Sequence, residues 1–504
     1  MLTGYVEKIL KARVYDVADE TPLDVMSRLS KRLGNTIFLK REDLQPVFSF
    51  KLRGAYNRMS QLSEDERQRG VICASAGNHA QGVALAASKM DVHALIVMPK
   101  TTPPIKVEAV RALGAEVCLH GNSYDDASSY AQGVAEKDGR TYIHPYDDPE
   151  VIAGQGTIAM EIIRQHPGAI HSIFIPVGGG GLISGVSAYI KAFWPEIKII
   201  AVEPADAASL KAALEADERV SLDQVGLFAD GTAVKQVGIE PFRICRETVD
   251  EVVTVDSDEL CAAIVDIFQE TRSIAEPSGA LGVAGIKKYL ATHDLHDEHI
   301  ITINSGANVN FDRLRHIAER AEIGERREVL FATTIPEQPG SFQRFCKMLG
   351  DRGITEFNYR FADNQQAQVF VGVRMNGKEE ERQQLFKQLD DAEYNWVDFT
   401  DNEAAKLHVR YMVGGHAPQV DNERLFRFEF PERPGALLRF LTRIGQRWNI
   451  SLFHYRNHGA AYGRVLVGIQ VAEEFNSEFQ VFLDTLGYVF WEETNNPAYS
   501  LFLK

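Results

Sequence analysis

Cysteine is scarce in this sequence, and its spacing forms no recognisable pair. The five cysteines are Cys73, Cys118, Cys245, Cys261 and Cys346. An odd number of widely scattered cysteines is not typical of a disulfide framework, a zinc site or a redox motif. We therefore expect reduced thiols and a cytoplasmic protein.

Basic residues are also in deficit. The chain has 54 lysines and arginines against 70 aspartates and glutamates, which gives a formal net charge of -16. Nucleic acids and anionic membrane surfaces are bound by basic surfaces, so we expect neither as a partner.

Long apolar runs are missing as well. No stretch of about eighteen uninterrupted apolar residues occurs, which argues against a transmembrane helix. The first twenty residues mix acids with bases and lack the apolar centre of a signal peptide. We expect no membrane segment and a mature N-terminus.

The composition that is present is that of a globular protein. Hydrophobic residues make up 45% and charged residues 25% of the 504 residues, enough to build a sizeable core. The length predicts about three domains.

Residues 37–310 alternate short β-branched runs with longer segments of helical period, which is typical of βαβ units. Strands are predicted at 71–75 and 93–99, with a helix capped by Asn78 between them. A further helix is expected to stop at Gly114, before a strand that ends near Gly121. The pattern predicts an α/β domain with a mostly parallel sheet, whose ligands bind at the carboxyl ends of the strands.

Beyond residue 320 the sequence contains an internal repeat. A charged helical connector is predicted at 318–329, and the two copies follow it at an offset of 95 to 96 residues. The shared landmarks are Pro339-Gly340 with Tyr359-Arg360, and Pro434-Gly435 with Tyr455-Arg456. Coincidence between two amphipathic segments is the alternative, but landmarks in the same order favour duplication. Each copy predicts strand, helix, strand, strand, helix, strand, the ferredoxin-like order.

Four short stretches of the first domain carry candidate chemistry. "SFKLRGA" places Lys51 beside apolar residues at a helix start, where an amine must be solvated, paired or chemically used. A surface lysine is the ordinary alternative. "GGGGL", Gly178 to Leu182, follows a predicted strand and precedes a predicted helix. Its N–H groups are therefore expected at the positive end of a helix dipole. A phosphate fits there, although a flexible turn is equally consistent with the sequence.

The other two stretches offer polar side chains at element ends. "SAGNHAQG" presents Ser75 and Asn78 at a helix start, suited to a carboxylate or a ring hydroxyl, with helix capping by Asn78 as the alternative. "NSGAN" places Ser305 at a strand end, where a turn or cap residue is the ordinary interpretation.

Taken together, these four motifs resemble those of the fold-type II (tryptophan-synthase-β-like) pyridoxal-phosphate enzymes. With the duplicated C-terminal region, the chain is similar to the biosynthetic threonine deaminase family over essentially its whole length. The resemblance implies a catalytic domain at 1–320 and ACT-like regulatory modules at 327–400 and 421–496. One departure is Phe48, where relatives often carry glycine or histidine; it bears no catalytic role.

The resemblance implies roles residue by residue. Lys51 forms a Schiff base with pyridoxal 5′-phosphate, and Asn78 bonds the ring oxygen of the cofactor. Ser305 faces the pyridine nitrogen. The backbone of Gly178, Gly179, Gly180, Gly181 and Leu182 holds the phosphate. Ser75, Gly77 and Asn78 are the candidates for the substrate carboxylate, at a helix N-terminus.

The implied reaction is β-elimination from L-threonine, with L-serine as a second substrate. The freed amine of Lys51 takes the Cα proton, the β-hydroxyl leaves as water with the phosphate as proton donor, and hydrolysis yields 2-oxobutanoate and ammonia. No metal is implied. By the same resemblance isoleucine inhibits, valine opposes it, and the assembly is a homotetramer. Effector contacts are expected near Tyr359 and Tyr455, which as aromatic residues on strands also suit packing.

Several alternatives use the same motifs. A serine dehydratase, serine racemase or threonine synthase would bind the cofactor through the same motifs, but the paired ACT-like modules favour the threonine deaminase family. An amino-acid-sensing protein on a retired enzyme scaffold is a different class, against which the intact Lys51 argues. A metal-dependent hydrolase is disfavoured because the histidines show no zinc-ligand spacing.

Overall fold

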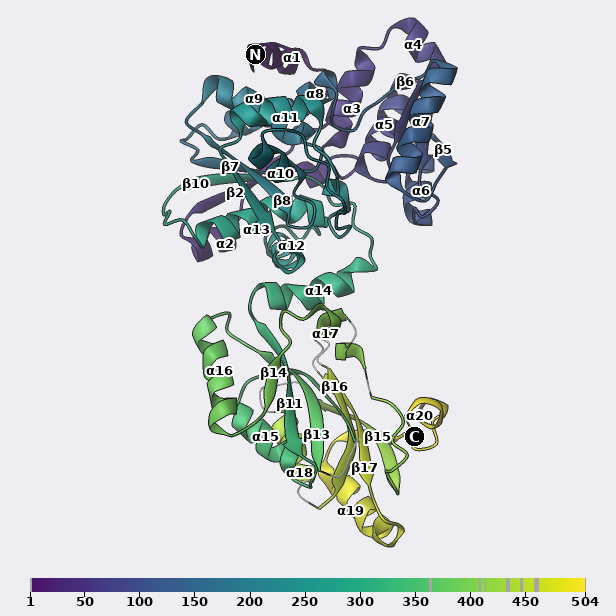
Figure 1. The fold of residues 1–504 in the computed structure, drawn as a ribbon, viewed down its shortest axis with the longest axis vertical. Helices are drawn as coiled ribbons and strands as arrows, with labels where there is room; N and C mark the ends of the chain where they lie inside the picture. The colour runs from purple at the N-terminus through teal and green to yellow at the C-terminus, as the bar shows by residue number, and fades with distance from the viewer. Residues whose placement is uncertain are drawn as a thin grey trace. The chain divides into compact units, whose positions relative to one another are not determined.

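The computed structural model divides the chain into two compact units, Met1–Ala321 and Glu322–Lys504, each described here by itself (Figure 1). It describes residues 2–361, 365–407, 409–412, 414–431, 436–444, 447–456 and 462–503.

The first unit contains a larger sheet of six strands in the order β1-β2-β10-β7-β8-β9. Only the β1–β2 pair is antiparallel. The strands are β1 (Leu23–Val25), β2 (Thr36–Arg41), β7 (Ser172–Pro176), β8 (Lys198–Pro204), β9 (Glu251–Val255) and β10 (His299–Asn304).

A smaller sheet of four parallel strands has the order β5-β4-β3-β6. The strands are β3 (Val71–Ala74), β4 (Ala94–Met98), β5 (Glu116–Leu119) and β6 (Thr141–Tyr142). Every residue of β3, β4 and β7 is buried, as expected for parallel strands covered on both faces.

Helices follow most of these strands and cover both sheets (Figure 1). They are α1 (Leu2–Lys11), α2 (Ser27–Leu33), α3 (Lys51–Ser60), α4 (Glu64–Arg69), α5 (Asn78–Met90), α6 (Pro104–Ala112), α7 (Tyr124–Asp138), α8 (Pro149–Gln165), α9 (Gly181–Phe193), α10 (Ser209–Ala216), α11 (Ile239–Thr248), α12 (Ser257–Thr271), α13 (Pro277–Leu290) and α14 (Arg313–Gly324). Two short 3-10 helices are η1 (Glu42–Leu44) and η2 (Asp230–Thr232).

The predicted parallel α/β architecture is confirmed, together with the strands at 71–75 and 93–99. Helix α6 ends just before Gly114, whose φ of +92° is a conformation that glycine adopts without steric cost. The predicted cap at Asn78 is wrong. Gly77 is the N-cap of α5 and Asn78 is its first helical residue, with no side-chain capping bond.

The second unit is an antiparallel sheet of eight strands in the order β14-β11-β13-β12-β16-β17-β15-β18. The strands are β11 (Glu328–Pro336), β12 (Ile354–Arg360), β13 (Gln366–Arg374), β14 (Trp396–Asp398), β15 (Glu423–Pro431), β16 (Asn449–Arg456), β17 (Tyr462–Gln470) and β18 (Val489–Glu492). The helices are α15 (Ser341–Leu349), α16 (Glu379–Asp391), α17 (Glu403–Leu407), α18 (Ala436–Ile444), α19 (Asn476–Leu486) and α20 (Pro497–Phe502), with 3-10 helices η3 (Val409–Tyr411) and η4 (Glu473–Phe475).

The predicted duplication is confirmed by the order of these elements. Each half runs strand, helix, strand, strand, helix, strand, and its fourth, first, third and second strands lie side by side in that order. The landmark Pro339-Gly340 directly precedes α15, and Gly340, the N-cap of this helix, has a φ of +85°. Its counterpart Pro434-Gly435 lies outside the described residues.

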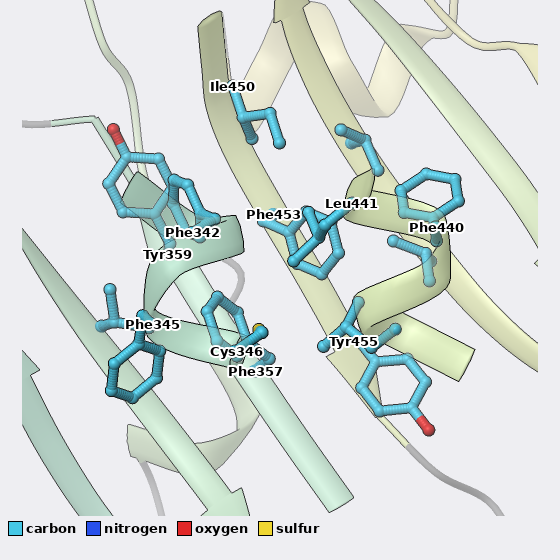
Figure 2. Packing of buried hydrophobic residues seen from close by; sticks show 14 of the residues in the cluster. Phe342, Phe345, Cys346, Phe357, Tyr359, Phe440, Leu441, Ile450, Phe453 and Tyr455 are labelled. Carbon is cyan, nitrogen blue, oxygen red and sulfur yellow. The ribbon is translucent and has the colours of Figure 1, made fainter. Parts of the chain in front are cut away.

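The two halves join through strands β12 and β16, which pair antiparallel with Tyr359 opposite Phe453. Helices α15, α16, α18 and α19 contribute to a single apolar core on one face of the sheet. Figure 2 shows aromatic side chains of both halves meeting there, among them Phe342, Phe357 and Phe453. The burial of this shared core explains why the two copies form one continuous sheet.

The connector before the first copy differs from the expectation in extent. The helix predicted within 318–329 begins earlier, at Arg313, and ends at Gly324, and Glu328 already opens β11. In the part of the chain that is described, no helix is long and apolar enough to cross a membrane.

Candidate active site

Lys51 is the first residue of α3, and it is partly buried at the start of the helix. Its Nζ donates a hydrogen bond to the carbonyl oxygen of Pro145 at 2.8 Å and lies 5.3 Å from the centroid of the Phe50 ring. Burial lowers the pKa of this amine to about 8, and the nearby Glu276 carboxylate opposes the shift. A large neutral fraction therefore exists near pH 8, as a nucleophilic amine requires.

A buried ionic network holds α3 in place. Arg53, two residues after Lys51, pairs with Glu42 at 2.8 Å and with Glu161 of α8 at 2.6 Å, and Lys40 of β2 also reaches Glu161 at 2.6 Å. All four side chains are fully buried. Because an uncompensated buried charge is costly, these groups tie α3 to β2 and α8.

The glycine stretch lies where it was expected, between β7 and α9. The carbonyl oxygens of Gly179 and Gly180 accept from the amides of Gly238 and Ser184, at 3.1 and 3.0 Å. Among the described residues, the backbone amides of 178–182 donate no hydrogen bond. These free donors at the start of a helix make a cradle for an anion.

The glycines of this turn are sterically required. A Cβ on Gly179 would lie 2.2 Å from Cγ of Tyr146, and Gly180 has a φ of +93°. The turn therefore accepts no larger residue without rearrangement. Tyr146 follows Pro145, the partner of Lys51, so the segment 144–148 connects the lysine to the glycine turn.

Asn78 takes part in a side-chain network at the start of α5. Its Nδ2 donates to Oε1 of Glu276 at 2.7 Å, and its Oδ1 accepts from Nδ2 of Asn308 at 2.6 Å. In the same loop, the amide of Gly77 donates to Oγ of Ser75 at 3.2 Å.

Ser305 follows β10 and is 4% exposed, with its Oγ donating to the carbonyl oxygen of Ser278 at 3.4 Å. Its own carbonyl accepts from the amide of Phe50 at 3.3 Å, so this turn touches the residue before Lys51. Phe48, in the neighbouring segment, has a φ of +56°, a conformation that glycine accommodates more readily. The four predicted stretches are thus brought together around Lys51.

Sequence reasoning missed three contributors: Glu276, Asn308 and the segment 144–148. Glu276 belongs to "AEPSGA", residues 275–280. Glu276 stands directly before Pro277, which opens a helix rich in small residues. This position is the signal in the sequence that could have drawn attention to Glu276. No group of three or more metal-binding side chains lies together within the described ranges.

Comparison with known proteins explains this arrangement. Residues 14–306 match the family described as pyridoxal-phosphate dependent enzyme, and 319–409 and 414–503 match the C-terminal regulatory domain of threonine dehydratase. The chain belongs to the pyridoxal-phosphate dependent enzymes. Within them, it is a member of the biosynthetic threonine dehydratase family.

The relatives support the narrower assignment. The chain is 58% identical to "L-threonine dehydratase biosynthetic IlvA" of Burkholderia multivorans, over 99% of both chains. It is 54% identical to the Escherichia coli protein of that name, over 99% of this chain and 97% of the relative. A solved structure of the processed form of threonine deaminase isoform 2 from Solanum lycopersicum is 52% identical, with a TM-score of 0.63 over 64% of this chain and 88% of that one.

The residues of this dehydratase family member fit its cofactor. Free amides at the glycine turn suit the phosphate, and an amine with a lowered pKa suits an aldehyde. Burial also lowers the pKa of His79 to about 3, with help from Lys51, so this neighbouring imidazole stays neutral. The site accordingly combines an amine that can be neutral or charged near pH 8 with free backbone amides that can bind an anion.

Proposed function

We propose that this enzyme dehydrates and deaminates L-threonine to 2-oxobutanoate and ammonia, the first committed step of isoleucine biosynthesis, with pyridoxal phosphate carried by Lys51. The observation that carries the proposal is the convergence of four separate stretches on one amine of lowered pKa. The relatives are named threonine dehydratases, which supports L-threonine as the substrate.

The contacts support the following division of labour, which the resemblance to the family implies. The free amides of 178–182 hold the phosphate, and the Nδ2 of Asn78 donates to the ring oxygen. The Oγ of Ser305 would face the pyridine nitrogen, where a hydroxyl, unlike a carboxylate, does not stabilise a protonated ring. When bound, the cofactor supplies an electron sink for the pair left at the substrate Cα.

Lys51 and the start of α5 act on the substrate. The neutral amine of Lys51 takes the Cα proton, and the β-hydroxyl would gain a proton from the cofactor's phosphate and depart as water. Ser75, Gly77 and Asn78 are proposed to hold the carboxylate at the positive end of α5. L-Serine differs from threonine by one methyl group, worth only about 1–3 kcal/mol of discrimination, so we expect both substrates to react.

The test is release of 2-oxobutanoate from threonine by Lys51→Ala and by the control Lys89→Ala, whose lysine is exposed on α5. Losing the amine should lower turnover by about 10²–10⁴-fold while the chain stays folded. The control should match the wild type. Borohydride reduction followed by peptide mapping should label Lys51. Wild-type turnover in Lys51→Ala would refute the assignment.

The regulatory role belongs to the proposed modules 327–400 and 421–496. A pocket in the second unit lies between the turn 338–340 of the first copy and the beginning of β16 in the second, with Phe342, Leu441 and Trp448 on its walls. We propose that isoleucine binds here and inhibits, after the pocket has widened to admit it, and that valine opposes it. The match of this region to a regulatory domain family supports the assignment.

The contacts favour Tyr359 over Tyr455 as an effector neighbour. Tyr359 donates a hydrogen bond from its hydroxyl to Glu337, and Nδ2 of Asn449, which lines the pocket, lies 3.5 Å from the other oxygen of Glu337. A carboxylate at this position suits an amino-acid ammonium group. Tyr359 is 3% and Tyr455 1% exposed, so burial does not separate them, but Tyr455 lies farther along β16 and does not line the pocket (Figure 2).

Assembly and location complete the proposal. A cytoplasmic location suits the five free cysteines, and the homotetramer is what the resemblance to the threonine deaminase family implies.

A further inference from the structure

Glu276 is a buried acid that does not serve the helix it precedes. It is 4% exposed, and its φ of −69° and ψ of 158° are those of the N-cap of α13, yet its side chain makes no capping bond. Its amide donates to the carbonyl oxygen of Gly306 at 3.0 Å, which fixes its backbone beside the turn that follows β10. The carboxylate extends away from α13, toward the start of α5.

The two oxygens of this carboxylate have separate donors. Oε1 accepts from Nδ2 of Asn78 at 2.7 Å, and Oε2 accepts from the backbone amide of Asn308 at 3.1 Å. An ionised carboxylate has only acceptors, so it can face both of these N–H groups at once.

The orientation of the Asn78 amide follows from this network. Nδ2 of Asn308 donates to the carbonyl oxygen of Val47 at 2.9 Å and to Oδ1 of Asn78 at 2.6 Å. A backbone carbonyl can only accept, so the Asn308 amide has one permitted orientation. Asn78 must then turn Oδ1 toward Asn308 and Nδ2 toward Glu276. Since Nδ2 carries two hydrogens, one N–H of Asn78 remains available.

We propose that Glu276 is a positioning residue, which orients the Asn78 amide so that its remaining N–H is offered to the ring oxygen of the cofactor. The inference rests on the role that the proposed function gives to Asn78. It adds a residue that, together with Asn308, prevents this amide from rotating by half a turn, which would present an oxygen to the ring oxygen instead.

The surroundings explain why a carboxylate is needed at this position. A Cβ on Gly306 would lie 2.9 Å from Oε1 of Glu276, and one on Gly231 would lie 3.3 Å from the same atom. The carboxylate of Glu276 therefore lies in a narrow slot between these two glycines. Glutamine would fit its shape but would turn one N–H toward a donor. The substitution therefore changes the hydrogen-bond polarity of the slot without changing its volume.

The charges around Glu276 set the condition under which the network holds. Burial raises the pKa of Glu276 to about 7 with a contribution from Asp230 of η2, whereas the bonds from Asn78 and Asn308 and the charge of Lys106 of α6 oppose the rise. Lys51 of α3 also faces it, and Lys106 pairs with Asp230 at 2.7 Å. Protonation would place an O–H against one of the two donors, so the Asn78 amide is held best above neutrality.

The test compares Glu276→Gln with Glu203→Gln in the full-length holoenzyme. Glu203 is a matched control because it is also fully buried with a pKa raised to about 7 by burial, and its carboxylate also accepts two N–H groups, from Leu210 and Lys211. Glu203 belongs to β8, and its carboxylate reaches the start of α10, outside the site. The measurements are the visible absorbance maximum of the bound cofactor, its pH dependence, the dissociation constant for pyridoxal phosphate, and borohydride labelling of Lys51.

We expect Glu276→Gln to shift the absorbance maximum and to weaken cofactor binding about tenfold, as the loss of one hydrogen bond to a charged group predicts. Lys51 should still be labelled. Glu203→Gln should lower thermal stability but keep the wild-type absorbance and its pH dependence.

An unchanged absorbance maximum and cofactor affinity in Glu276→Gln would overturn the inference alone. If that variant does not fold, the same measurements on Asn308→Ala decide, because removing the donor to Oδ1 should also shift the absorbance, and a wild-type spectrum would overturn the inference. A wild-type chain in which borohydride labels no lysine at position 51 would overturn the proposed function and this inference with it.

Discussion

At the scale of single residues, the site works with ionisable groups whose pKa values burial has moved toward neutrality. Burial lowers the pKa of Lys51 to about 8 and raises that of Glu276 to about 7, so each group can change charge under ordinary conditions. His79, in contrast, is held neutral. Perturbed groups of this kind gather at catalytic sites because an acid or base works best when its pKa lies near the working pH.

This predicts the pH dependence of cofactor uptake by the cofactor-free enzyme. Attack on the aldehyde requires the neutral amine, and a lowered pKa makes the neutral form available at lower pH. The rate of uptake, followed by visible absorbance, should rise with a midpoint near pH 8. In Glu276→Gln the midpoint should move below that of the wild type, because the Glu276 carboxylate raises the pKa of Lys51. A midpoint near the ordinary lysine value of 10.5 would contradict the burial argument.

At the scale of elements, the site is assembled from the ends of helices and strands. The turn between β7 and α9 supplies free amides, the start of α5 supplies Asn78, and the end of β10 supplies Ser305. Such ends carry unpaired backbone groups, which is why ligands gather at the carboxyl edge of a parallel sheet.

The glycine turn gives a prediction at this scale. In Gly179→Ala the new methyl group would meet the ring of Tyr146, so we expect a loss of about 1–3 kcal/mol in stability and weaker cofactor binding, measured by thermal unfolding and cofactor titration. Gly133→Ala is the control: this position in α7 has no atom within 4 Å of the added Cβ. It should be neutral or slightly stabilising. Adding Tyr146→Ala to Gly179→Ala should restore part of the stability, and a double variant no more stable than Gly179→Ala would argue against this clash.

At the scale of the whole molecule, the chain consists of two compact units with separate cores. The cores of the first unit form around its two sheets, whereas the second unit joins two copies of one motif through β12 and β16. A ligand in the second unit can affect catalysis only if it binds more tightly to one conformation of the molecule than to another.

Truncation after Glu325 tests this division of labour. The shortened chain keeps all of the first unit, so we expect it to release 2-oxobutanoate from threonine without inhibition by isoleucine. The full-length enzyme, assayed in parallel at the same substrate concentrations, is the control and should be inhibited. Inhibition that survives truncation would place the effector site in the first unit.

The sequence by itself determined the features that are contiguous along the chain. The alternation of strands and helices, the glycine turn at 178–182 and the duplicated motif are all local patterns, and the structure contains each of them. Backbone geometry and apolar periodicity decide such features within a few residues, so they are visible in the sequence. The exception was Asn78, predicted as a cap although its amide bonds Glu276 and Asn308 instead.

Only the tertiary structure decided which distant side chains meet. Glu276 and Asn78 are 198 residues apart, and the loop that contains Pro145 reaches Lys51 across 94 residues. A hydrogen bond depends on distance and direction in space, and no local pattern records which acid will face which amide after the sheets have formed. The amine was therefore found from the sequence, while the groups that orient its partners and set its charge were found only in the fold.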